Sequence, residues 1–133
     1  RKSRAGCAGC CKRTGFLLMP VCRPLAPDDR ALLEAEARTQ LALHALQGWQ
    51  LFQEGAGWRL LKTYPTTNFA QALALAQRIG WLAEREQHHP ELRIAWGRCA
   101  VAWWTTRLNG LHENDFRMAA ATDDILFGGR DLS

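Results

Sequence analysis

The spacing of apolar and polar positions predicts a helix and then a β-hairpin in the first half of the chain. Apolar residues recur every four positions, at Leu33, Ala37, Leu41 and Ala45. Pro27 and two aspartates suit the first turn of a helix over 27–48, and Gly48 suits its end. Two runs rich in branched and aromatic residues, 49–53 and 58–64, flank a glycine-rich link and indicate the hairpin.

The second half of the chain repeats this order. Asn68, with a glutamine three positions later, predicts a capping box, and apolar residues keep a helical spacing from there to Glu84. Alternation at 92–96 predicts a half-buried strand. The run 99–105 is almost wholly apolar, so we expect either that both of its faces are covered or that one of them forms an interface.

A last helix is predicted to begin near Asp115, whose carboxylate is placed to accept early backbone N–H groups. Two glycines after residue 127 end it. The predicted order is therefore α-β-β-α-β-β-α, without long crossovers. This order favours an α+β fold with a four-stranded antiparallel sheet that carries three helices on one face.

Residues 1–26 differ from the rest of the chain. They show no sustained period, and they contain six Lys or Arg, no acid and four of the five cysteines. We expect 1–26 to be a disordered basic tail outside a single domain at 27–130, so that its deletion would leave the melting temperature nearly unchanged.

Charge and cysteine content exclude several classes of function. Residues 28–133 contain more acids than bases, so a nucleic-acid partner is not expected. No apolar run approaches the length of a membrane helix, and we predict a cytoplasmic protein with no membrane partner. Cys7 and Cys10 are a possible zinc half-site, but no histidine lies nearby, so no metal and no cofactor are expected.

Candidate chemistry gathers where the second predicted helix ends. His88 and His89 are adjacent, Pro90 follows them and cannot continue a helix, and Glu84 lies one helical turn before His88. Imidazole is well suited to moving protons near neutral pH, and a carboxylate can orient a ring. The group predicts an acid–base site, although the two histidines alone also fit a helix end without function.

A longer pattern around these residues resembles the pterin-4a-carbinolamine dehydratase family, including its Rubisco-assembly-factor branch. The matching residues are Glu84, His88-His89-Pro90, Trp96, Trp103-Trp104-Thr105, Gly110-Leu111 and Asn114-Asp115-Phe116. The resemblance covers most of the chain after the tail. It implies a four-stranded sheet with three helices that forms homodimers through sheet edges, and often homotetramers.

The resemblance also implies roles for single residues. The expected catalytic residues are His88, His89 and Glu84. The expected substrate-binding residues are Trp96, Trp104, Thr106 and Asp115, with the two tryptophans as walls of a pterin pocket. Dehydration of a carbinolamine needs an acid for the leaving hydroxyl and a base for the amine proton, and neither step needs a metal.

One position departs from the family pattern. The family places a third catalytic histidine directly after the threonine of the apolar strand, and this chain has Thr106 there. A threonine hydroxyl binds water or a substrate oxygen, but it is not an acid or base near neutral pH. His112, six residues further on, is not expected to replace the missing histidine.

Three functions fit these observations, and we predict the first of them. The first is a hydro-lyase that dehydrates 4a-hydroxytetrahydrobiopterin to quinonoid dihydropterin in cofactor recycling, weakened by Thr106. The second is a non-enzymatic relative, such as the Rubisco assembly factors of α-carboxysomes or the dimerisation partners of an animal homeodomain protein. The third is an enzyme for another pterin. Neighbouring genes for a hydroxylase, for Rubisco or for molybdenum-cofactor synthesis would separate them.

Overall fold

The computed structural model describes residues 20–128. It contains helices α2 (Glu34–Leu43), α3 (Phe69–Glu86) and α4 (Glu113–Gly128), and the 3₁₀ helix η2 (Thr106–Leu108). Its strands are β1 (Gln50–Glu54), β2 (Gly57–Pro65), β3 (Glu91–Ala95) and β4 (Arg98–Trp103). The predictions for residues 1–19, including the cysteines there, lie outside the described residues.

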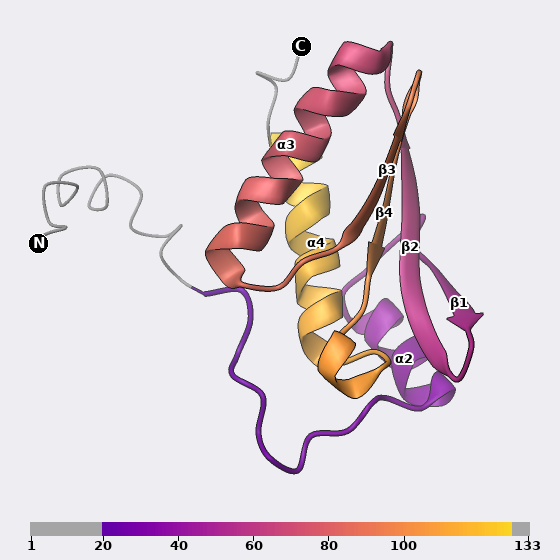
Figure 1. The fold of residues 1–133 in the computed structure, drawn as a ribbon. Helices are drawn as coiled ribbons and strands as arrows, with labels where there is room; N and C mark the ends of the chain where they lie inside the picture. The colour runs from indigo at the N-terminus through magenta and orange to yellow at the C-terminus, as the bar shows by residue number, and fades with distance from the viewer. Residues whose placement is uncertain (1–19, 129–133) are drawn as a thin grey trace, which may run out of the picture.

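The strands form one antiparallel sheet in the order β1-β2-β4-β3. Figure 1 shows α3 and α4 lying across one face of this sheet, with α2 near its lower end. Two-residue turns close both hairpins, and Gly55 and Gly97 take the left-handed backbone that such turns need. The predicted α+β fold and its order of helices and strands are confirmed.

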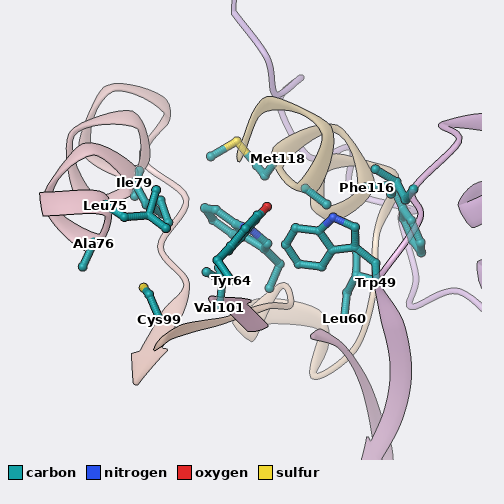
Figure 2. Close-up of a cluster of buried hydrophobic side chains, with 14 of the residues drawn as sticks. Trp49, Leu60, Tyr64, Leu75, Ala76, Ile79, Cys99, Val101, Phe116 and Met118 are labelled. Atoms are coloured by element: carbon teal, nitrogen blue, oxygen red, sulfur yellow. The ribbon is translucent and has the colours of Figure 1, made fainter. Parts of the chain in front are cut away.

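The core lies between the sheet and the helices. Figure 2 shows Tyr64 and Val101 from the strands facing Ile79 of α3 and Met118 of α4. These side chains are almost fully buried, and each such burial contributes roughly 1.5–3 kcal/mol to folding. Within residues 20–128, no helix is both long and apolar enough to cross a membrane.

Helix α3 is the element that positions the candidate histidines. Asn68 caps its start by accepting the N–H of Gln71 at 2.8 Å. Its end is a Schellman turn, because Gln87 takes a left-handed conformation with φ +54° and the N–H of His88 donates to the carbonyl of Ala83. The helix therefore stops before Pro90, at a turn made by the backbone itself.

The first predicted helix is shorter than expected at both ends. It spans Glu34–Leu43 instead of 27–48. The carboxylate of Asp29 accepts the N–H of Ala26 and the guanidinium of Arg23, so it stabilises a turn and an ion pair instead of a helix start. At the other end Ala45 has φ +51°, which breaks the helix before Gly48.

The residues just before the expected domain boundary at 27 make contacts with the rest of the structure. Residues 20–29, which we call the N-terminal strap, lie against the domain. Val21 and Cys22 pack on the core, and Arg23 bonds to Asn114 and Glu113 of α4. Sequence periodicity does not reveal such a segment, because backbone groups and one arginine make most of its contacts.

Deleting residues 1–26 is now expected to destabilise the protein, contrary to the expectation from sequence. The deletion leaves Glu86 and Asn114 without their strap partners, and orphaned buried polar groups cost about 1–3 kcal/mol each. Thermal unfolding should show a melting temperature several degrees lower. Deletion of 1–19 alone is the control, since it keeps the contacts of the strap with Glu86, Glu113 and Asn114. Equal melting temperatures for the two deletions would contradict the prediction.

Candidate active site

The site lies where the end of α3, the end of β4 and the first turn of α4 meet. His88 follows the left-handed turn after α3, and its Nε2 lies 2.6 Å from Oδ1 of Asp115. Asp115 has no solvent-exposed surface. The structure thus pairs His88 with Asp115, whereas the sequence suggested Glu84 as its neighbour one helical turn back.

Asp115 is held by donors from two directions. Its Oδ2 accepts the hydroxyl of Thr105 at 2.8 Å and the backbone N–H of His112 at 2.9 Å. The second bond caps α4, as the sequence predicts. Because the carboxylate is an acceptor in every contact, His88 is assigned as the donor through Nε2–H. In the neutral imidazole Nδ1 then carries the lone pair, so it is the ring nitrogen able to accept a proton.

Trp103 fixes the ring plane of His88. The two rings are nearly parallel, with centroids 5.6 Å apart and an interplanar angle of 5°. The indole is fully buried, and its Nε1–H donates to Thr122 of α4. With a carboxylate at one edge and an indole against one face, His88 has little freedom to rotate.

Trp103 was not predicted as a site residue, although the alternation of side chains between the two faces of a strand indicates it. Adjacent residues of a strand point to opposite faces, so Trp103 and its neighbour Trp104 cannot both face the helix layer. Trp104 instead packs under the guanidinium of Arg59, 4.4 Å from the ring centroid. The structure does not bring Trp104 to His88.

His89 and Glu84 form a second pair on the outside of the same corner. The Nε2 of His89 lies 2.5 Å from Oε2 of Glu84. Both side chains are more than half exposed, at 53% and 64%. The two histidines therefore have different surroundings: His88 is 15% exposed and bound to a buried carboxylate, while His89 faces water.

The remaining predicted residues lie at different distances from this corner. Thr106 is exposed and begins η2, directly after the Thr105 that binds Asp115. Trp96 is 73% exposed in the turn between β3 and β4, at the opposite end of β3 from His89. Within one copy of the chain, Trp96 is not brought to the histidines.

His112 has a structural position rather than an open one. It is almost fully buried, and its Nδ1 accepts the N–H of Asn114 at 3.0 Å. Its Nε2 lies 3.3 Å from Asp29 of the strap. Both ring nitrogens of His112 therefore have partners within the described structure.

An open cavity of about 620 Å³ adjoins His88. It is lined by Arg85–His88 with Arg107 and Asn114, and by Pro20 and Cys22–Leu25 of the strap. Among residues 20–128, no three metal-ligating side chains come together, and metal-free chemistry stays a prediction. The cavity gives a ligand access to His88.

The fold and this corner define an α+β protein with a buried histidine–carboxylate pair beside a cavity. The sequence model of the family described as pterin 4 alpha carbinolamine dehydratase matches residues 30–125. The chain belongs to this family, and the resemblance noted in the sequence is confirmed.

Similar proteins support the assignment. Proteins of Chlorobium luteolum and Microcystis aeruginosa, each named "Putative pterin-4-alpha-carbinolamine dehydratase", are 44% and 48% identical to the chain. The matches cover 68% and 77% of this chain and 80% of each relative. A solved structure, a transcriptional coactivator/pterin dehydratase from Brucella melitensis, has a TM-score of 0.62 and 29% identity, covering 72% of this chain and 98% of that one.

Proposed function

We propose that the chain is a hydro-lyase that dehydrates 4a-hydroxytetrahydrobiopterin to quinonoid dihydropterin, at a rate reduced by Thr106. The observation that carries the proposal is the buried His88–Asp115 pair beside an open cavity. Stopped-flow measurement of carbinolamine dehydration by the wild type and by His88→Ala tests it, and the expected values are given in the Discussion.

His88 and His89 divide the chemistry in this proposal. The Nδ1 of His88 takes the proton from N5–H of the substrate, and Asp115 stabilises the resulting imidazolium. A protonated His89, oriented by Glu84, gives a proton to the 4a-hydroxyl, which leaves as water. The electron pair of the N5–H bond forms the C4a=N5 double bond, so that no oxidant, metal or cofactor is consumed.

Thr106 favours a second candidate, a non-enzymatic role. A chain that keeps the fold but lacks the family's third histidine resembles the Rubisco assembly factors of α-carboxysomes. In that role the wild type has no dehydration activity, and it raises the yield of assembled Rubisco when the two are expressed together. Genes for Rubisco and carboxysome shell proteins beside the coding gene would favour this candidate.

Homodimers or homotetramers in the cytoplasm are part of the proposal. Apolar side chains are exposed on α3 at Phe69, Leu73 and Trp81, and on the edge strand β3 and its turn at Ile94 and Trp96. Water-exposed apolar patches and open sheet edges favour association. Light scattering at micromolar concentration should give a dimer or tetramer. Replacing Trp81 with lysine should lower the mass if α3 forms an interface, and a monomeric wild type would contradict the proposal.

A further inference from the structure

The N-terminal strap crosses the site. Figure 1 shows it as the indigo chain that passes the lower end of α3 and continues towards α2. It lies before residue 30, where the match to the family begins. The family match therefore says nothing about the strap, although residues 20 and 22–25 line the cavity beside His88.

Glu86, the last residue of α3, holds the first part of the strap. Its Oε1 accepts the N–H of Val21 at 2.9 Å and of Cys22 at 3.0 Å. Its Oε2 accepts a hydrogen bond from Arg85, and only 5% of the side chain is exposed. A carboxylate so buried depends on these donors for its stability, so the strap and Glu86 hold each other in place.

Asn114 and Arg23 hold the next part. The Asn114 side chain accepts from the N–H of Arg23 at 3.0 Å and donates to its carbonyl at 2.8 Å. The Arg23 side chain bonds to Asp29 and Glu113. The hydrogen bond from Arg23, followed by that from Ala26, holds the pKa of Asp29 well below its usual range. This stabilisation is present above the ordinary carboxyl pKa and is lost only in strong acid.

The two residues that bind the strap, Glu86 and Asn114, are close in sequence to His88 and Asp115, the proposed acid–base pair. Glu86 lies two residues before His88, and Asn114 directly precedes Asp115. A ligand whose reacting ring lies at His88 occupies a cavity that is also lined by residues of the strap. The strap contributes Pro20, Arg23 and Pro24 to this lining, and η2 contributes Arg107. These groups suit a polar chain rather than a bare ring.

We propose that the strap is the wall of the substrate site that selects pterins with an extended polar substituent, and that Glu86 is the positioning residue that seats this wall. The inference rests on the proposed pterin function and deepens it. It predicts that loss of the Glu86 anchor affects a pterin with a dihydroxypropyl chain and spares one with a methyl group in its place.

Pterin fluorescence tests this directly, with biopterin and 6-methylpterin titrated against the full chain. Glu86→Ala should weaken biopterin binding by about fivefold and change 6-methylpterin binding by less than about twofold, as expected for a few lost ordering contacts. Glu86→Gln should have a smaller effect, because its amide oxygen still accepts the strap N–H groups. Glu54→Ala, an exposed glutamate in β1, is the matched control.

The rate at which the Cys22 thiol is labelled measures whether the strap is docked. Burial raises the pKa of its thiol to about 12, so thiol reagents should label it slowly in a variant with Cys7, Cys10 and Cys11 changed to serine. Biopterin should slow the labelling further, and Glu86→Ala should speed it.

The results of these experiments distinguish failure of the strap inference from failure of the proposed pterin function. If biopterin binds without protecting Cys22, or if Glu86→Ala affects both pterins equally or neither, the strap is not a selective wall, and the pterin function stands. If the wild type binds no pterin, the proposed function fails and this inference fails with it.

Discussion

Replacing Thr106 with histidine is expected to raise the rate of carbinolamine dehydration by about tenfold or more, since an acid–base group typically contributes ~10²–10⁴ in rate. Position 106 follows Thr105, whose hydroxyl binds the same carboxylate as His88. A histidine at position 106 would be adjacent in sequence to Thr105, which belongs to the hydrogen-bond network around His88, the proposed base. Thr67→His, which alters another exposed threonine before α3, is the matched control and should leave the rate unchanged.

His88→Ala completes this test. It should lower the wild-type rate by ~10²-fold or more, to near that of the uncatalysed reaction, because it removes the group assigned as base. His44→Ala, at the end of α2, serves as the control. Wild-type activity that does not depend on His88 would contradict the site assignment. No activity in either the wild type or Thr106→His would favour the assembly-factor role.

Asp115→Ala is expected to destabilise the fold by roughly 3–5 kcal/mol, the range for removing one member of a buried polar pair. Removing the carboxylate leaves the Thr105 hydroxyl, the His112 N–H and Nε2 of His88 without their acceptor. Chemical denaturation measures this free energy of unfolding. Asp124→Ala alters an exposed aspartate of the same helix, so it should change stability by less than about 0.5 kcal/mol.

Asp115→Asn separates the effect on catalysis from the effect on folding. The amide retains one acceptor for the N–H of His112, so the variant should lose less stability than Asp115→Ala. The amide N–H₂ group favours a His88 tautomer with its proton on Nδ1, which removes the base and should lower the rate as much as His88→Ala does. A stable Asp115→Asn variant with full activity would show that the pair is only structural.

Much of the fold follows from local patterns in the sequence. Asn68 and the apolar spacing after it specify α3, and glycines mark both hairpin turns, because these signals depend on residues close in the chain. The start of α2 could not be predicted in this way. Asp29 lies in a sequence that is typical of a helix start. In the structure, however, its carboxylate binds the guanidinium of Arg23, because both residues belong to the docked strap.

Three polar residues of the corner were predicted from the sequence, but the way in which they pair was not. Motif spacing identified His88, His89 and Asp115, but it could not assign which carboxylate meets which ring. The left-handed turn at Gln87 decides this, since it directs His88 inward to Asp115 and leaves His89 with Glu84. Non-glycine residues adopt that conformation uncommonly, and no spacing rule forecasts it here.

That single turn at Gln87 also sets how the proposed catalyst returns to its starting state. After each turnover the shielded His88 holds an extra proton and the solvent-facing His89 lacks one. His89 recovers its proton from bulk water at once, whereas His88 must release its own through the cavity. In this proposal the two histidines therefore exchange protons by different routes, His89 directly with bulk water and His88 through the cavity.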